Sequence, residues 1–307
     1  MLVRTLIVQS PSPVGLAERL RAPAGVALQM GPFVVRIRAR LRGLAEPLQV
    51  LYGDYPTVDG DGLADFHVSL ERPRNLRGWV QPQALFKLDG RSLFEPFPED
   101  TALPLFEWGL NYCVARRSHQ YLMLHAAAVE RGGRVLLLPA VPGSGKSTLC
   151  AALAHRGWRL FSDEFGLFDF KHRRFVGFPR PVALKNESIE VIRRFAPEAV
   201  FGPLFPKTRK GTVAHLRPPT AAVRRMAEGA EPGWIVFPKY AAGSPLLIRS
   251  LPKAQSFLRL AHNSFNYEIT GADGFRAVGA IVRACECYEL TYSDLEQAVA
   301  HLDRLTA

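Results

Sequence analysis

A lysine and two hydroxyl side chains follow a glycine-containing turn in the segment Pro142-Gly143-Ser144-Gly145-Lys146-Ser147-Thr148. In such a turn the backbone N–H groups point at a bound anion, and the first turn of the following helix adds further N–H groups. Lys146 has the reach to contact a β- or γ-phosphate, and the Ser147 hydroxyl is a ligand for Mg²⁺. The segment therefore predicts a site for the phosphates of a nucleotide.

The residues around this turn favour the same interpretation. The apolar run 136–138 before the turn is typical of a buried strand, and apolar residues at helical spacing in 149–155 indicate a helix after it. The full pattern, G-x-x-x-x-G-K-[ST], has Ala140 in place of its first glycine. Alanine suits that position if its φ is negative. The alternative is a strand, turn and helix that bind nothing.

Two carboxylates, Asp163 and Glu164, follow the strand predicted over 159–162. If that strand lies beside the strand of the turn in a parallel sheet, both strand ends face one crevice. We then expect Asp163 close to the γ-phosphate held by Lys146. One carboxylate would accept the proton of an attacking hydroxyl and the other would bind Mg²⁺. The alternative is a solvated acidic turn.

Basic residues further along the chain are candidates for contacts with the transferred phosphate. The strand predicted over 234–238 is followed by a lysine and not by a carboxylate, which favours Asp163 as the acid of the site. We expect Lys185, Arg217 and Lys239 to stabilise charge on the phosphate oxygens. The alternative for each is a solvated basic surface. Residues 203–219, rich in proline and lysine, are predicted to form an exposed loop that closes over the nucleotide.

The composition is that of a globular protein with a basic surface. The chain has 307 residues, of which 48% are hydrophobic and 22% charged, enough for two modest domains or one large one. Its net charge of +11 suits phosphate ligands and acidic partners. The sequence has no recognisable nucleic-acid-binding module, so we do not expect nucleic acid as a partner.

The cysteine spacing and the N-terminal residues give a prediction for the cellular compartment of the protein. Cys113, Cys150, Cys285 and Cys287 fit neither a zinc site nor a disulfide framework, and we expect buried thiols. The N-terminus lacks the apolar core and cleavage site of a signal peptide, and no apolar run has the length of a membrane span. We therefore predict a cytoplasmic protein that does not cross a membrane.

The pattern of elements changes near residue 118. Residues 1–118 are predicted to form a β-rich recognition region, with strands over 33–41, 48–52, 66–70 and 84–88 and a helix over 103–117. Residues 119–307 are predicted to be α/β. Its expected strands are 122–129, 135–138, 159–162, 165–170, 174–178, 234–238 and 287–290. Its expected helices are 147–155, 187–195, 253–261, 274–284 and 293–305, the last with Ser293 as its N-cap.

Three segments together resemble one known family. They are the run 125–129 beginning with His125, the glycine-lysine-serine loop, and 156–164, which reads Arg-Gly-Trp-Arg-Leu-Phe-Ser-Asp-Glu. In this order and spacing they resemble the catalytic domain of the HPr serine kinase/phosphorylase family, itself similar to the nucleotide domain of phosphoenolpyruvate carboxykinase. The resemblance is good over residues 121–180 and loose over 181–307. Residues 1–115 do not resemble the usual N-terminal domain of the family.

The resemblance implies a P-loop kinase domain of this type with a mixed sheet, preceded here by the β-rich region. It implies ATP and Mg²⁺ as donor and cofactor, Asp163 as the base toward a serine hydroxyl, and Glu164 in place of a second aspartate. It also implies that His125 is the active-site histidine near the transferred phosphate, whereas the sequence alone also allows a histidine satisfied within its strand. A homo-oligomer is implied in the same way.

The sequence departs from the family at three places. Ala140 replaces a glycine, Thr148 stands where the bifunctional members have glutamate, and no glycine-rich segment follows Pro203. We therefore expect a one-way kinase acting on a hydroxyl of a protein, a peptide or a metabolite other than HPr itself. The alternative is a nucleotide-gated binding or scaffold protein with little or no catalysis.

Overall fold

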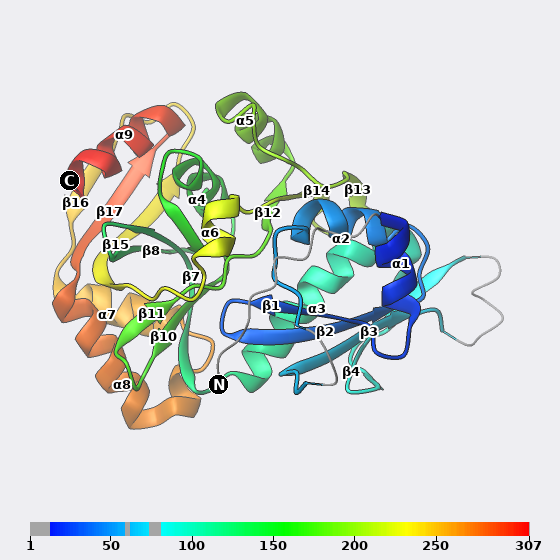
Figure 1. The fold of residues 1–307 in the computed structure, drawn as a ribbon. Helices are drawn as coiled ribbons and strands as arrows, with labels where there is room; N and C mark the ends of the chain where they lie inside the picture. The colour runs from blue at the N-terminus through cyan, green and yellow to red at the C-terminus, as the bar shows by residue number, and fades with distance from the viewer. Residues whose placement is uncertain (1–12, 59–61, 74–80, 307) are drawn as a thin grey trace. The chain divides into compact units, whose positions relative to one another are not determined.

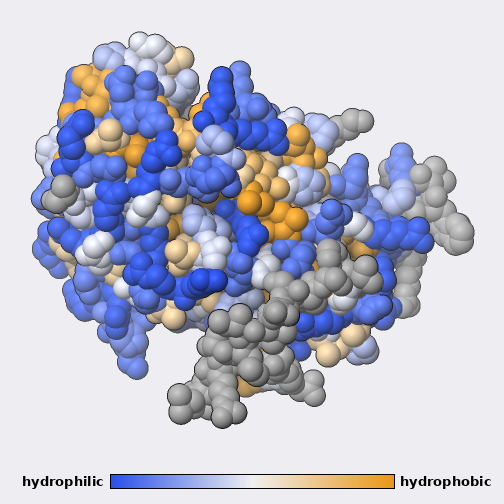
Figure 2. All heavy atoms as spheres, turned by 45° about the horizontal axis from the view of Figure 1, so that its top comes forward, coloured by the Kyte–Doolittle hydropathy of each residue, from blue (hydrophilic) through white to orange (hydrophobic). Residues whose placement is uncertain are grey.

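The structure, a computed structural model, describes residues 13–58, 62–73 and 81–306. Contacts divide the chain into two compact units: unit 1 is Met1–Arg116 with Val200–Arg217, and unit 2 is Arg117–Ala199 with Pro218–Ala307. The expected division after residue 118 does not include this return of 200–217 to unit 1. The face of the molecule drawn in Figure 2 is mostly hydrophilic. Over the described residues, no helix combines the length and apolar character that a membrane crossing needs.

Unit 1 contains a mixed sheet with a long helix packed against it (Figure 1). Its elements are α1 Pro13–Arg21, β1 Val26–Met30, β2 Phe33–Ala39, α2 Ala45–Tyr52, β3 Phe66–Glu71, β4 Gln83–Leu88, β5 Arg91–Ser92, β6 Phe97–Pro98, the short 3₁₀ helix η2 Glu99–Thr101, α3 Ala102–Arg117, β13 Phe205–Thr208 and β14 Gly211–Leu216. Strand β2 pairs with β1 antiparallel and with β3 parallel. Helix α3 approaches the sheet closely at Gly109, where a Cβ added to the glycine would lie only 2.4 Å from the Phe86 ring.

Two predictions for unit 1 are wrong. The run 48–52, expected as a strand, belongs to α2, whose buried residues Leu48, Leu51 and Tyr52 have helical spacing. An apolar run this short fits either periodicity, and burial of one helix face decides between them here. Residues 203–219, expected as an exposed loop, contain the antiparallel hairpin of β13 and β14. The last four residues of β14 are buried, and the prolines and lysines before and after this short strand concealed it in the sequence.

Unit 2 is built on a mixed sheet with strand order β11-β10-β7-β8-β15-β17-β16, and β9 also pairs with β7. Its strands are β7 Tyr121–Arg131, β8 Arg134–Pro139, β9 Arg159–Ser162, β10 Phe165–Asp169, β11 Arg174–Val176, β12 Val182–Lys185, β15 Glu231–Tyr240, β16 Leu247–Ser250 and β17 Glu286–Tyr292. Its helices are α4 Lys146–Ala154, α5 Glu187–Phe195, α6 Thr220–Arg224, α7 Lys253–His262, α8 Tyr267–Ala284 and α9 Leu295–Leu305.

Helices cover both faces of this sheet, which explains why its central strands are apolar throughout. Helices α7 and α8 pack on one face, where Leu137 of β8 and Ile235 of β15 meet Leu260 and Ile281. Helices α4 and α9 contact each other and lie on the opposite face (Figure 1). All residues from Val135 to Leu138 are fully buried between these two layers.

Two details of unit 2 bear on the sequence predictions. The N-cap of α9 is Asp294, whose carboxylate accepts a hydrogen bond from the Gln297 N–H at 2.9 Å, so the prediction of Ser293 as the cap is wrong. The Ser293 hydroxyl instead donates to the Ser244 carbonyl. The four cysteines are all buried, as predicted.

The packing of β8 gives a stability prediction. Leu137→Ala removes a fully buried side chain from the core of unit 2, and we expect it to lower the free energy of unfolding by about 2–5 kcal/mol. The matched control is Leu258→Ala on α7, because Leu258 is 68% exposed and its loss should change this free energy by about 0.5 kcal/mol or less. Urea unfolding followed by circular dichroism measures both. Equal effects of the two substitutions would contradict the assignment of β8 to the core.

Candidate active site

The turn between β8 and α4 has the backbone that phosphate binding requires. Gly143 and Gly145 have φ values of 86° and 84°, in the left-handed region that favours glycine. A Cβ on Gly145 would also lie 2.5 Å from the Tyr292 hydroxyl. Positive φ among the described non-glycine residues is confined to Asp89, Arg173 and Asn186, so Ala140 has a negative φ and replaces the first glycine without strain.

Hydrogen-bond donors are available at this turn. The N–H groups in the first turn of a helix have no acceptor within that helix, and Gly145 provides no side-chain cap for α4. The Ser144 hydroxyl is buried and makes no hydrogen bond within the described part of the chain. Buried donors without an acceptor are unfavourable unless a ligand supplies one. The turn therefore fits an anionic ligand such as a phosphate chain.

Lys146 points from this turn to the two predicted carboxylates. Its Nζ donates to the Asp163 carbonyl oxygen and lies 3.5 Å from Asp163 Oδ1 and 3.9 Å from Glu164 Oε2. The side chains of Lys146 and Asp163 are both buried. Burial lowers the pKa of Lys146, but the charges of Asp163 and Glu164 outweigh this effect and raise the pKa above its ordinary value. Lys146 is therefore a buried ammonium group.

Asp163 and Glu164 lie at a break in a strand. Strands β9 and β10 both pair antiparallel with β7, through Ser162 opposite Ala128 and Phe165 opposite His125, and the two acidic residues leave the ladder between them. The Ser162 hydroxyl accepts hydrogen bonds from the Glu164 and Phe165 N–H groups at 3.2 and 3.0 Å. These bonds replace pairing that the break removes.

The prediction that the strand before the loop and the strand over 159–162 are neighbours in the sheet is wrong. The proximity of Lys146 and Asp163 that it implied is nevertheless found. Strands β8 and β9 are not adjacent, because β7 lies between them and pairs antiparallel with each. Two strands that are both antiparallel to a third run in the same direction. Their carboxyl ends, Pro139 and Ser162, therefore lie at the same end of the sheet, and Lys146 reaches Asp163 there.

His125 contacts the more exposed of the two carboxylates. Its Nε2 lies 3.2 Å from Glu164 Oε1, and its ring lies 5.1 Å from that of Phe265, centre to centre. Burial raises the pKa of Glu164, but the hydrogen bond with His125 and the charge of Lys146 outweigh it and hold the pKa at about 2. His125 is thus engaged with a candidate site residue and is not satisfied only within its strand.

The segment 263–266 borders His125 by pairing with β7. The His125 N–H donates to the Asn263 carbonyl, and Phe265 N–H donates to the Met123 carbonyl. The Asn266 side chain completes the pairing with the backbone of Met123 and Tyr121. This pairing leaves Phe265 40% exposed beside His125.

Four more of the predicted site residues lie in or near the loop or at the end of a strand of unit 2. Ser147 and Thr148 lie in the first turn of α4, and Pro142 is exposed in the loop. Lys185 is exposed at the end of β12, and its charge contributes to the low pKa of Glu164.

The other two predicted basic residues belong to different units. Lys239 is exposed near the end of β15. Arg217 belongs to unit 1, where its guanidinium forms an ion pair with Asp54 at 2.5 Å. Arg217 therefore already has a carboxylate partner in that unit.

Sequence reasoning did not find Tyr240 and Tyr292, which contact the loop from the ends of β15 and β17. Tyr292 donates to the Gly145 carbonyl at 3.2 Å, and the Tyr240 N–H donates to the Ser144 carbonyl at 2.9 Å. The predicted strands ended at residues 238 and 290, short of both tyrosines. The parallel register that pairs Tyr240 with Tyr292 carries no local sequence signal.

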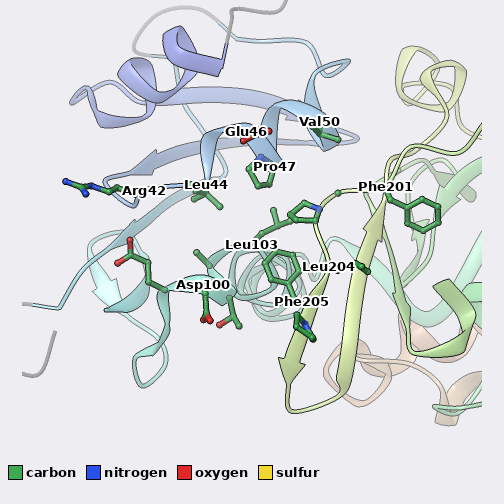
Figure 3. Close-up of a pocket in the computed structure, with 17 residues that line it drawn as sticks. Arg42, Leu44, Glu46, Pro47, Val50, Asp100, Leu103, Phe201, Leu204 and Phe205 are labelled. Atoms are coloured by element: carbon green, nitrogen blue, oxygen red, sulfur yellow. The ribbon is translucent and has the colours of Figure 1, made fainter. Parts of the chain in front are cut away.

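A separate pocket of about 810 Å³ lies within unit 1 (Figure 3). Three segments line it: 42–50 around the start of α2, 99–103 around η2 and the start of α3, and 201–206 leading into β13. The lining combines apolar side chains such as Leu103 and Phe205 with the carboxylates Glu46 and Asp100. Its size lies within the range of ligand-binding cavities.

The low pKa of Glu164 gives a pH prediction. A carboxylate whose pKa is held below its ordinary value stabilises the fold above that value and loses this effect as the pH falls. The difference in free energy of unfolding between wild type and Glu164→Gln should therefore shrink as the pH falls from 4.5 to about 2. Urea titrations across this range measure it, with Glu268→Gln on α8 as an exposed control. A difference independent of pH would contradict the ion pairs of Glu164.

Comparison with known proteins adds little to this geometry. No family model and no curated protein matches the chain. Among solved structures, the chain is similar to the Hpr(Ser) kinase/phosphatase from Coxiella burnetii over 60% of its own length and 96% of that chain, with 12% sequence identity and a TM-score of 0.24. At that TM-score the likeness carries no argument about function. What stands is a mixed α/β fold with a candidate site at the carboxyl ends of β8 and β9.

Proposed function

We propose that this chain is an ATP- and Mg²⁺-dependent kinase that transfers the γ-phosphate to a serine or other hydroxyl of a protein, a peptide or a metabolite. The observation that supports this most is the placement of Lys146 within 3.9 Å of the carboxylates of Asp163 and Glu164. The cluster adjoins a glycine turn in which the buried Ser144 hydroxyl makes no hydrogen bond within the described part of the chain. Phosphate-binding groups and a proton acceptor are the two requirements of phosphoryl transfer to a hydroxyl.

The loop would hold the phosphates. The N–H groups of Gly143 and of residues 145–148, together with the Ser144 hydroxyl, would donate to phosphate oxygens, as at other helix N-termini that bind anions. Lys146, whose pKa is raised, carries the positive charge that a β- or γ-phosphate needs. On binding, its ammonium would exchange part of its contact with Asp163 for the phosphate.

Asp163 would act as the base. It would accept the proton of the acceptor hydroxyl while the hydroxyl oxygen forms a bond to the γ-phosphorus and the bond from that phosphorus to the β,γ-bridging oxygen breaks. The products are the phosphorylated acceptor and ADP. His125 would hold Glu164 in place beside the reacting groups through their 3.2 Å contact.

Ser147 and Glu164 would hold Mg²⁺, and Asp163 is the second carboxylate that could ligate it in a state where it is not acting as the base. No group of three or more histidine, cysteine or acidic side chains forms a metal cluster among the residues the structure describes. Mg²⁺ in kinases is bound by one or two carboxylates together with phosphate oxygens and water, so these residues suffice. When bound, Mg²⁺ neutralises charge on the β- and γ-phosphate oxygens.

Basic and apolar features outside this cluster would serve the substrates. Lys185 and Lys239 are exposed in unit 2 and would stabilise the transferred group or attract the nucleotide. Arg217, already paired with Asp54, is a weaker candidate for this role. We assign recognition of the acceptor to unit 1, and the pocket at Leu103 and Phe205 supports this assignment.

Asp163→Asn tests the base. The amide cannot accept the proton, so we expect kcat to fall about 10²- to 10⁴-fold while ATP still binds. The measurement is transfer of radiolabel from [γ-³²P]ATP, with ATP affinity from calorimetry and thermal unfolding as a check on folding. Asp169→Asn, which alters a carboxylate paired with His172, is the matched control and should leave transfer unchanged. Wild-type transfer by Asp163→Asn would show that the base assignment is wrong.

The same label separates the proposal from a nucleotide-gated scaffold. A kinase labels an acceptor in an extract of its own cells, and the label is protein-bound for a protein or peptide and soluble for a metabolite. If ATP binds tightly and no acceptor is labelled, the scaffold is the better account. Lys146→Met, which removes the ammonium group, should reduce labelling in every case where the chain itself is the kinase.

A further inference from the structure

Two tyrosines stand beside the phosphate loop at the ends of neighbouring strands. Strand β15 pairs parallel with β8 on one side and with β17 on the other, so all three strands end at the same edge as the loop. Tyr240 and Tyr292 are partners in the register of β15 and β17. This is the edge at which ligands bind in open α/β sheets.

The two tyrosines have different relations to solvent. Tyr292 is 2% exposed, and its hydroxyl donates to the Gly145 carbonyl. Its role is to support the backbone of the loop. Tyr240 is 49% exposed, although its own backbone N–H is fixed to the Ser144 carbonyl.

The ring of Tyr240 is held at the loop in a defined position. Its Cβ lies 3.0 Å from the point where a Cβ on Gly145 would be, so the side chain starts in contact with the loop. Its ring meets that of Tyr292 edge to face, with 5.9 Å between centroids and an interplanar angle of 72°. One side of the ring is thus packed, and half of its surface is open to a ligand.

The other exposed aromatic residues of unit 2 are engaged elsewhere. Phe265 packs on His125 and Phe165 at the carboxylates, and Phe275 of α8 packs on Phe257 of α7. Of the exposed aromatic side chains in the described part of unit 2, Tyr240 is therefore the one that adjoins the phosphate loop.

We propose that Tyr240 is the stacking surface for the base of the nucleotide donor. The inference rests on the proposed function, in which the donor is ATP, and adds the residue that binds the base and so distinguishes ATP from an inorganic polyphosphate. An aromatic ring offers its face to a purine or pyrimidine, and stacking of a base on such a ring contributes a large part of nucleotide affinity. Inorganic tripolyphosphate has no group for this ring to bind.

The test compares ATP with tripolyphosphate, both with Mg²⁺, by calorimetry on the full chain. We expect Tyr240→Ala to weaken ATP binding about tenfold and to leave tripolyphosphate binding within about twofold. Tyr240→Phe keeps the ring and should bind ATP like wild type, and Tyr240→Leu keeps apolar bulk without a ring and should behave like Tyr240→Ala.

Two controls separate stacking from support of the loop. Tyr292→Phe removes the hydrogen bond to Gly145 and should weaken ATP and tripolyphosphate alike. Tyr112→Ala in unit 1, where Tyr112 is 38% exposed, should change neither affinity.

The outcomes distinguish this inference from the proposed function. If Tyr240→Ala weakens both ligands equally, or neither, while wild type binds both, the stacking role is wrong and the phosphate site stands. If wild type binds neither ATP nor tripolyphosphate, the phosphate site itself is wrong and the inference fails with it.

Discussion

Strand β7 exchanges one pairing partner for another on each of its two edges, at residues 124–128, and the candidate site depends on this. On one edge β8 pairs with residues 126–131 of β7, and Ser264 pairs with Leu124, just beyond the end of β8. On the other edge β9 gives way to β10, with Asp163 and Glu164 released between them. Each exchange frees a chain segment, and the two segments carry the loop of Lys146 and the acidic pair. A continuous ladder on either edge would remove half of the site.

The charges at this point hold one another in place. Lys146 and Asp163 are both buried, and a buried ion is unfavourable unless an opposite charge and hydrogen bonds compensate it. The Asp163 carbonyl and carboxylate provide that compensation for Lys146. Glu164, more exposed, is shared between Lys146 and His125. A phosphate entering the loop would therefore meet an ammonium group that already has partners, and its binding is an exchange of partners within a fixed cluster.

How much of this was predictable depends on the range of the interactions. The loop, its strand and its helix follow from local residue types, and the glycines at 143 and 145 adopt the positive φ that such a turn needs. The direction of β8 and β9 was also inferred correctly, but β7 between them was not, because pairing order is not encoded locally. The run 48–52 and the hairpin within 203–219 were misassigned where short or proline-rich segments fit two patterns. Tyr240 reaches the loop through a register between distant strands, which one sequence does not reveal.

The return of Val200–Arg217 to unit 1 makes both units discontinuous along the chain. A ribosome releases the chain from its N-terminus, and domains generally fold as units once their residues are available. Unit 1 lacks the hairpin of β13 and β14 until residue 217 has emerged, by which time the first segment of unit 2, Arg117–Ala199, has already emerged. Unit 2 in turn waits for β15 and β17, which complete its central sheet. Unit 1 therefore cannot finish folding before residue 217 is made, and from residue 117 to residue 217 the growing chain carries two incomplete cores.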